Sequence, residues 1–164
     1  MQDRGIEFKP IGFVKSPIDS PKNAPIQPSG ARDLAGEIII EEQFSGGLKD
    51  LAGFSHIIVL YHFHLSNGYK LHCKPFLDDA IHGIFAIRGP ARPNPIGLSV
   101  VELKSVVDNR LYIKGVDMVD GTPVLDIKPY VPQFDVRENV RIGWLKGKAE
   151  KGATAKSDDR FVDE

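Results

Sequence analysis

The residues best suited to chemistry lie between Arg88 and Ser99, where two guanidinium groups and an amide stand among three prolines. Proline fixes its own φ near about −65° and pushes the residue before it into extended geometry, so Gly89, Arg92 and Asn94 keep few conformations. An arginine presents a planar fork of donors that matches a carboxylate or a phosphate. The pattern therefore predicts a rigid loop that binds an anionic ligand. The alternative is a proline-rich turn between two strands with surface arginines.

A second polar cluster runs from Asp117 to Tyr130. Side chains alternate along a strand, so Asp126, Lys128 and Tyr130 are expected on one face, where they present a carboxylate, an amine and a phenol. The turn at 120–122, Asp-Gly-Thr, has backbone donors and a hydroxyl that suit a ribose or a carboxylate. The structural alternatives are a tight hairpin turn and a simple ion pair between Asp126 and Lys128.

Three histidines, His56, His62 and His64, fall on one face of a predicted strand. Two imidazoles in a His-x-His pattern suit a metal ion, but a site needs a further carboxylate or histidine at a suitable distance. None of the remaining candidates has a recognisable ligand spacing, so no metal ion is expected. We expect His56 to be a hydrogen-bonded core residue and His64 to line a site. The remaining metal-ligand candidates are Glu102, His72 and His82.

Short strands are expected to position these residues. With 16 glycines and 12 prolines among 164 residues, the chain exceeds the usual share of about 12% for the two types together. Alternating or β-branched runs predict the strands, and weaker patterns predict short helices at 47–51 and 75–80. The predicted strands cover 11–14, 37–41, 54–64, 83–87, 98–104, 111–116 and 123–128.

Two turn signals connect the last three of these strands. Asp108-Asn109 and Asp120-Gly121 suit two-residue turns with positive φ, which would join neighbouring strands into a meander. The sequence therefore predicts a mainly β fold: a single β-barrel-like domain of short, mostly antiparallel strands with one or two short helices. The predicted domain spans 1–144, and 145–164 is expected to form a charged tail that is mobile or contacts a partner subunit.

Composition limits the classes of function. The formal net charge of −1 argues against a generic nucleic-acid coat and requires any bound polynucleotide to use a local basic patch. The single Cys73 cannot form an internal disulfide, and the N-terminus lacks the apolar stretch of a signal peptide. No apolar run approaches the ~18 residues of a membrane span, so we expect a soluble, cytoplasmic protein.

Four stretches resemble the TsaA-like or TrmO-like tRNA methyltransferases in residue type, order and spacing: 11–17 followed by 25–28, then 53–56, 88–99 and 117–130. The resemblance implies S-adenosyl-L-methionine-dependent methylation of N6 in threonylcarbamoyladenosine, next to the anticodon of tRNA. It also implies a β-barrel homodimer with the cofactor near the subunit interface. No Gly-x-Gly-x-x-Gly follows a predicted strand, so nothing suggests a doubly wound cofactor fold. The chain is expected to lack the C-terminal domain of longer bacterial members.

The resemblance also assigns roles to individual residues. Arg88 is expected to pair with the methionyl carboxylate of the cofactor, and Asp117, Asp126 and His64 remain alternative bases for removing a proton from N6. Arg92, Lys128 and Tyr130 are expected to contact the threonyl carboxylate or RNA phosphates, while Asn94 fixes the loop. The cofactor-binding residues implied are Gln27, Pro28, His64, Leu65, Arg88, Leu98, Asp120, Gly121 and Thr122.

Two other classes of function remain open. The chief alternative is a barrel that binds S-adenosyl-L-methionine or another nucleotide as a sensor or adaptor without catalysis, and the third class is a cupin-like metalloenzyme. If tRNA is the substrate, exposed basic residues must hold it; the alternative is that these residues are solvated surface groups without a binding role. The basic residues considered are Lys70, Lys74, Arg137 and Arg141.

Overall fold

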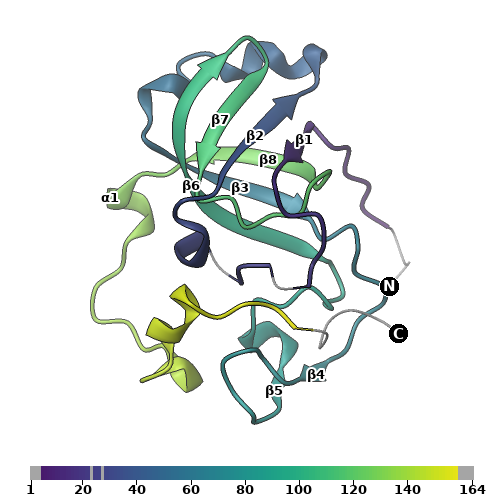
Figure 1. The fold of residues 1–164 in the computed structure, drawn as a ribbon, viewed down its shortest axis with the longest axis vertical. Coiled ribbons are helices and arrows are strands. Elements are labelled where there is room, and N and C mark those ends of the chain that lie inside the picture. Colours follow the sequence, from purple (N-terminus) through teal and green to yellow (C-terminus); the bar gives the residue numbers. More distant parts are fainter. Residues whose placement is uncertain (1–4, 23, 27, 159–164) are drawn as a thin grey trace.

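The computed structural model describes residues 5–22, 24–26 and 28–158 and shows a closed antiparallel barrel (Figure 1). Each strand pairs with two neighbours in the order β1-β2-β7-β6-β3-β8, so the predicted mainly β, barrel-like fold is confirmed. The longest strand, β6, curves along the barrel with a register shift opposite β7. The strands are β1 (Gly12–Lys15), β2 (Ala35–Ile40), β3 (His56–His62), β6 (Ile96–Val107), β7 (Arg110–Lys114) and β8 (Pro123–Pro129).

The barrel interior is filled by the inward-facing half of each strand. In β3, Ile57, Val59 and Tyr61 are buried while the residues between them are more exposed, as the alternation of side chains predicts. The β-branched and leucine side chains of the other strands complete one continuous core. Its further members are Val14, Ile38, Ile40, Val101, Leu103, Leu111, Ile113, Val116, Met118 and Val124.

The predicted meander is only half correct. Asp108, with a φ of 52°, occupies the turn that joins β6 to β7, as the sequence indicated. However, β8 pairs with β1 and β3 rather than with β7. The reason is that residues 115–122 cross the end of the barrel and bury Val116 and Met118 in its core. Gly121, with a φ of 76°, therefore turns the chain toward a distant strand and closes no hairpin.

Several smaller elements differ from the predictions. The stretch predicted as a strand at 83–87 forms only the end of β5 (His82–Gly83), paired with β4 (His72–Cys73), and then a 3-10 turn η4 (Ile84–Ala86). That turn buries Ile84 and Ile87 and leaves Phe85 and Ala86 between them exposed. A spacing of three residues between buried positions suits a 3-10 turn, whereas a strand would bury every second residue. The helix expected at 75–80 is absent from this described stretch, because the Asp78 carboxylate accepts hydrogen bonds from the next two backbone amides and holds a turn.

The remaining described helices are all short. The region expected to be helical at 47–51 lies across two 3-10 helices. Among the described residues, none of the helices has the length and apolar character that crossing a membrane requires. The bounds are η1 (Pro28–Ala31), η2 (Glu42–Leu48), η3 (Leu51–Gly53), α1 (Pro132–Asp135), η5 (Gly143–Leu145) and η6 (Ala149–Ala153).

The described part of the C-terminal tail packs against the rest of the chain. The backbone N–H of Ser157 donates to the Ala24 carbonyl at 2.8 Å, and Lys156 forms an isolated antiparallel bridge with Pro25. Gly152, within η6, is buried. In Figure 1 this segment, in yellow, lies beside the two-stranded sheet β4–β5. The domain boundary at residue 144 stays a prediction.

Candidate functional site

A cavity of about 730 Å³ opens at the end of the barrel. Its walls include the proline-rich loop at 85–92, the end of β3 with the residues after it at 61–66, and the start of β6 at 96–98. The crossing segment at 117–122 and the C-terminal segment at 144–158 also contribute. The lining is largely apolar, with a few charged and polar groups, as in typical small-molecule sites. The cavity thus brings together the two polar clusters that the sequence singled out, although they lie far apart in the chain.

A largely buried polar network forms part of the cavity wall, where Tyr61 and Asp117 line the cavity. Ser99 Oγ donates to Asp117 Oδ1 at 2.7 Å and lies 3.3 Å from the hydroxyl of Tyr61. Because one hydroxyl carries one hydrogen, the Tyr61 hydroxyl must donate to Ser99 when Ser99 donates to an ionised Asp117. Ser99 is 1% exposed and Tyr61 7% exposed, so neither exchanges these partners for water. The network fixes the carboxyl of Asp117, which lines the cavity.

The protonation states of the cavity follow from burial. Removal from water raises the pKa of Asp117 to about 6, although the hydrogen bond from Ser99 opposes the change. Burial, with the nearby charge of Asp117, also raises the pKa of Tyr61, so this phenol keeps its proton. Burial and the neighbouring His62 lower the pKa of His64. Near neutral pH the cavity therefore holds a carboxylate of unusually high basicity, a neutral phenol and a neutral imidazole.

The two arginines of the proline-rich loop have different surroundings. Arg88 lines the cavity and makes no hydrogen bond or ion pair with any other described residue. Arg92 Nη1 instead donates to the carbonyls of Ile87 and Gly89 at 3.0 and 3.2 Å. Arg92 thereby braces the loop, and the guanidinium of Arg88 remains available for an anionic ligand.

The turn at 120–122 is bound mainly to the rest of the protein. Asp120 Oδ1 accepts a hydrogen bond from the Ser16 backbone N–H at 2.9 Å, and the Gly121 N–H donates to Val14. Thr122 lines the cavity, but its hydroxyl donates to the Val119 carbonyl at 2.6 Å. This turn therefore holds the crossing segment in place, which is a structural role, although it does not close the tight hairpin considered from the sequence.

The third predicted group, from β8, lies outside the cavity. Asp126 Oδ2 pairs with Lys128 Nζ at 2.7 Å on the outer surface, which is the simple ion pair considered from the sequence. Tyr130 packs edge-on against His56 at the opposite end of β3 from the cavity. The outward orientation results from the pairing of β8 with β3, where Leu60 faces Asp126 across the strands.

The predicted site residues thus divide into three groups. Gln27 lies outside the described residues, and Pro28 begins η1. The predicted residues that line the cavity are His64, Leu65, Arg88, Arg92, Leu98, Asp117 and Thr122. Those that do not line it are Asn94, Asp120, Gly121, Asp126, Lys128 and Tyr130.

Sequence reasoning missed Tyr61 and Ser99. A polar residue on the apolar face of each predicted strand was the available signal, since Tyr61 alternates with Ile57 and Val59, and Ser99 with Val101. Ser66 was also missed: its hydroxyl is buried at the cavity without a hydrogen-bond partner among the described residues. The same described part of the chain contains no cluster of three or more metal-ligating side chains.

Comparisons with known proteins add an independent finding. A family model described as the tRNA-methyltransferase O N-terminal domain matches residues 13–136. A "probable S-adenosyl-L-methionine-binding protein" of Pyrococcus abyssi is 53% identical over 94% of this chain and 84% of its own length. The tRNA (adenine(37)-N6)-methyltransferase of Escherichia coli is 38% identical over 77% of this chain and 58% of its own.

A solved structure agrees with these sequence matches. The crystal structure of TrmO from Pseudomonas aeruginosa superimposes with a TM-score of 0.73 at 36% identity, covering 85% of this chain and 62% of the other. The chain therefore spans most of the archaeal relative but about three-fifths of the two bacterial proteins. The cavity and its polar network fall within the matched region, apart from the wall contributed by residues after 136.

Proposed function

The chain belongs to the tRNA-methyltransferase O family, and from this premise we propose that it transfers a methyl group from S-adenosyl-L-methionine to N6 of the adenosine next to the anticodon of tRNA. One observation carries the proposal. One cavity combines the guanidinium of Arg88, which has no hydrogen-bond or ion-pair partner among the described residues, with a carboxylate of raised pKa, from Asp117. These two groups can anchor an amino-acid carboxylate and accept a proton from the reacting nitrogen, respectively.

The residues present fit the methyl donor. Arg88 would bind its carboxylate, and Ser66 offers a buried hydroxyl that still lacks a partner among the described residues. Phe63, Phe85 and Leu98 supply apolar surface of the kind that holds a nucleoside. When bound, S-adenosyl-L-methionine supplies an electrophilic methyl group on a sulfonium. The cavity volume of about 730 Å³ lies within the usual range of ligand sites, about 300–1,000 Å³.

Asp117 is the proposed proton acceptor. The lone pair of N6 is delocalised into the attached ureido group and the ring, so removal of its proton favours attack on the methyl carbon. Ser99 holds the Asp117 carboxyl at the cavity wall, and a pKa of about 6 leaves it ionised at neutral pH yet more basic than an ordinary aspartate. His64 shares the cavity and is the alternative base. Asp126 lies outside the cavity, so it could accept this proton only if N6 approached from outside the cavity.

We propose threonylcarbamoyladenosine as the specific substrate. Its threonyl carboxylate requires a cation near the target base, and Arg92 lines the same cavity as Arg88 while bracing the loop. The RNA backbone requires further basic groups around the cavity. Lys70, Lys74, Arg137 and Arg141 are all exposed and are the proposed phosphate contacts.

We also propose that the active form is a homodimer. Large apolar side chains are exposed after β8, including Phe134 at 70% and Val140 at 60%, and such a group suits a subunit interface. The outward-facing Asp126, Lys128 and Tyr130 do not line the cavity of their own chain. In a homodimer they would act at the cavity of the partner subunit. Light scattering coupled to size exclusion should report twice the chain mass. The cytoplasmic location stays a prediction.

Methyl transfer to tRNA tests the proposed function. The chain is incubated with deuterium-labelled methyl donor and tRNA from cells that lack the modification, and nucleosides are analysed by mass spectrometry. Labelled N6-methylated threonylcarbamoyladenosine is the expected product, and tRNA without the threonylcarbamoyl group is the control substrate. Binding of the donor without transfer would favour the sensor or adaptor instead, and stoichiometric metal in the purified protein would favour the metalloenzyme.

A further inference from the structure

The cavity has a wall that lies outside the region shared with the family model. That model ends at residue 136, whereas Trp144, Leu145, Ala149 and Gly152 all line the cavity. Figure 1 shows this C-terminal segment, residues 143–157, next to the β4–β5 sheet and the loop that follows it. A wall contributed by a segment with so little regular structure must be held by specific contacts, because 3-10 turns of this length contribute little stability alone.

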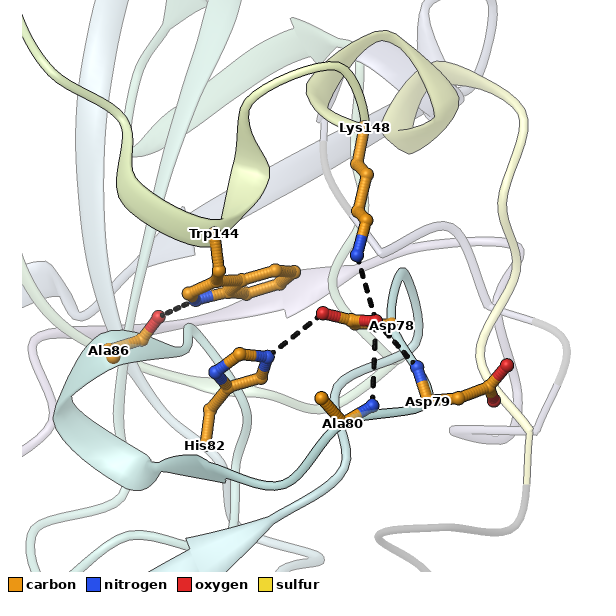
Figure 2. A network of polar contacts seen from close by, with 7 residues as sticks. All are labelled: Asp78, Asp79, Ala80, His82, Ala86, Trp144 and Lys148. Carbon is orange, nitrogen blue, oxygen red and sulfur yellow. Dashed lines mark hydrogen bonds and ion pairs between the residues drawn. The ribbon is translucent and has the colours of Figure 1, made fainter.

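Asp78 provides the central contact (Figure 2). Its Oδ1 accepts from Lys148 Nζ at 2.8 Å, and its Oδ2 pairs with His82 Nε2 at 3.0 Å. The same carboxylate accepts the backbone N–H groups of Asp79 and Ala80 at 2.8 and 3.4 Å, so its position is fixed by its own turn. Lys148 and His82 hold the pKa of Asp78 well below its usual range, so the carboxylate stays ionised under ordinary assay conditions.

Trp144 connects the C-terminal segment to the loop of the proposed cofactor site. Its indole Nε1 donates to the Ala86 carbonyl at 2.8 Å, two residues before Arg88. Its ring stacks on His82 with centroids 4.6 Å apart and an angle of 20° between planes. Figure 2 shows the imidazole beneath the indole, with a dashed line from the imidazole to the Asp78 carboxylate at its side. Asp78 therefore orients His82, and His82 supports the indole that lines the cavity.

The far end of the segment is fixed independently. Ser157 donates its backbone N–H to Ala24 at 2.8 Å, and its hydroxyl hydrogen-bonds to the Pro21 carbonyl. Loss of the Asp78 contacts would therefore loosen the part of the wall around Trp144 and Lys148 without releasing the whole tail. A substitution at Asp78 tests one section of the wall.

We infer that the C-terminal segment forms a wall of the cavity that the methyl donor needs for binding. Asp78 is the positioning residue that holds this wall in place, through His82, Trp144 and Lys148. The inference rests on the proposed function for the identity of the ligand. A ligand that needs the wall binds only the docked population, so its apparent dissociation constant rises as that population falls. Asp78→Ala is thus expected to weaken ligand binding and to raise KM for the donor, while kcat changes little because Asp117 and Ser99 are untouched.

Trp144 makes the inference measurable without turnover, since it is the only tryptophan of the chain. S-adenosylhomocysteine is titrated into the full-length protein while tryptophan emission is recorded, and calorimetry gives the dissociation constant separately. Asp79→Ala is the matched control, because it removes the same charge from the adjacent exposed residue, whose side chain points away from the cluster. Lys148→Ala is the second variant, since loss of one surface lysine leaves the Asp78 turn intact.

The expected results separate the inference from the proposed function. Wild type and Asp79→Ala should bind S-adenosylhomocysteine alike, while Asp78→Ala should bind it about tenfold more weakly and Lys148→Ala should lie between these values. In Asp78→Ala and in Lys148→Ala, Trp144 should be more accessible to acrylamide than in wild type. Folded Asp78→Ala or Lys148→Ala protein that binds within about twofold of wild type overturns the inference alone. Failure of the wild-type chain to bind S-adenosylhomocysteine contradicts the proposed function, and the assignment of the wall falls with it.

Discussion

Replacing Asp117 with asparagine should remove most of the methyl-transfer activity and, at the same time, stabilise the fold. Asparagine matches the carboxyl in shape, and its side-chain oxygen can still accept the hydrogen bond from Ser99. It cannot accept a proton from N6, however, and it carries no charge to be desolvated at the cavity wall. The two effects have opposite signs because the same burial that makes Asp117 basic makes its ionised form costly.

The size of the stability effect follows from the pKa. In the folded chain the carboxyl titrates near 6 rather than at its ordinary 3.8, and one pKa unit corresponds to about 1.4 kcal/mol. The folded state keeps the proton that the unfolded state releases, so the free energy of unfolding of wild type falls as pH rises through this interval and stays lower above it. The free energy of unfolding of Asp117→Asn does not fall in this way, so the variant is more stable than wild type by at most about 3 kcal/mol.

The assay compares wild type and Asp117→Asn in urea-unfolding experiments at about pH 4 and about pH 8. The free energy of unfolding of Asp117→Asn should exceed that of wild type by almost nothing at the lower pH and by the largest amount at the higher pH. Single-turnover methyl transfer should fall by about 10²–10⁴-fold, the usual contribution of a general base. For wild type the rate should rise with pH and level off above about 6, where the carboxyl is ionised.

Two results would refute the role of Asp117. A variant that keeps activity within about tenfold of wild type would show that the carboxylate is not the proton acceptor. A stability difference that does not depend on pH would show that its pKa is not raised in the fold. If His64→Asn or Asp126→Asn loses activity while Asp117→Asn does not, the corresponding residue takes the role of base.

Three further predictions concern other parts of the account. Arg88→Ala should weaken S-adenosylhomocysteine binding by about 10–100-fold in calorimetry, the range of a lost charge-assisted hydrogen bond, while the melting temperature stays near that of wild type. Gly97→Ala should destabilise the barrel by about 1–3 kcal/mol in thermal unfolding, because the added Cβ would lie 2.3 Å from the Tyr61 ring; an unchanged melting temperature would contradict that packing. The logarithm of the tRNA association constant should fall steeply and linearly with the logarithm of salt concentration, and a flat profile would argue against phosphate contacts.

The sequence predicted the elements better than their connections. Alternation within single segments indicated most of the barrel strands, and the turn at Asp108 was visible because a two-residue hairpin is a local feature. The partners of β8 were not predictable in this way. Burial of Val116 and Met118 draws residues 115–122 across the end of the barrel, and no local pattern distinguishes such a crossing from a hairpin loop.

The site shows the same limit. The loop around Arg88 and the acidic crossing segment were recognised by composition, and the structure places both at one cavity. The partners of Asp117 were missed, because Ser99 and Tyr61 meet it only after two strands pair in register. The direction in which Asp126 faces depends likewise on the neighbour that β8 selects, which is a long-range property of the barrel.

A crystal structure of the full chain grown with S-adenosylhomocysteine tests the central claim most directly. The ligand is expected to occupy the cavity between the loop at 85–92 and the crossing segment at 117–122, with its carboxylate on the guanidinium of Arg88. A ligand bound elsewhere on the barrel, or bound in this cavity with its carboxylate away from Arg88, would contradict the central claim.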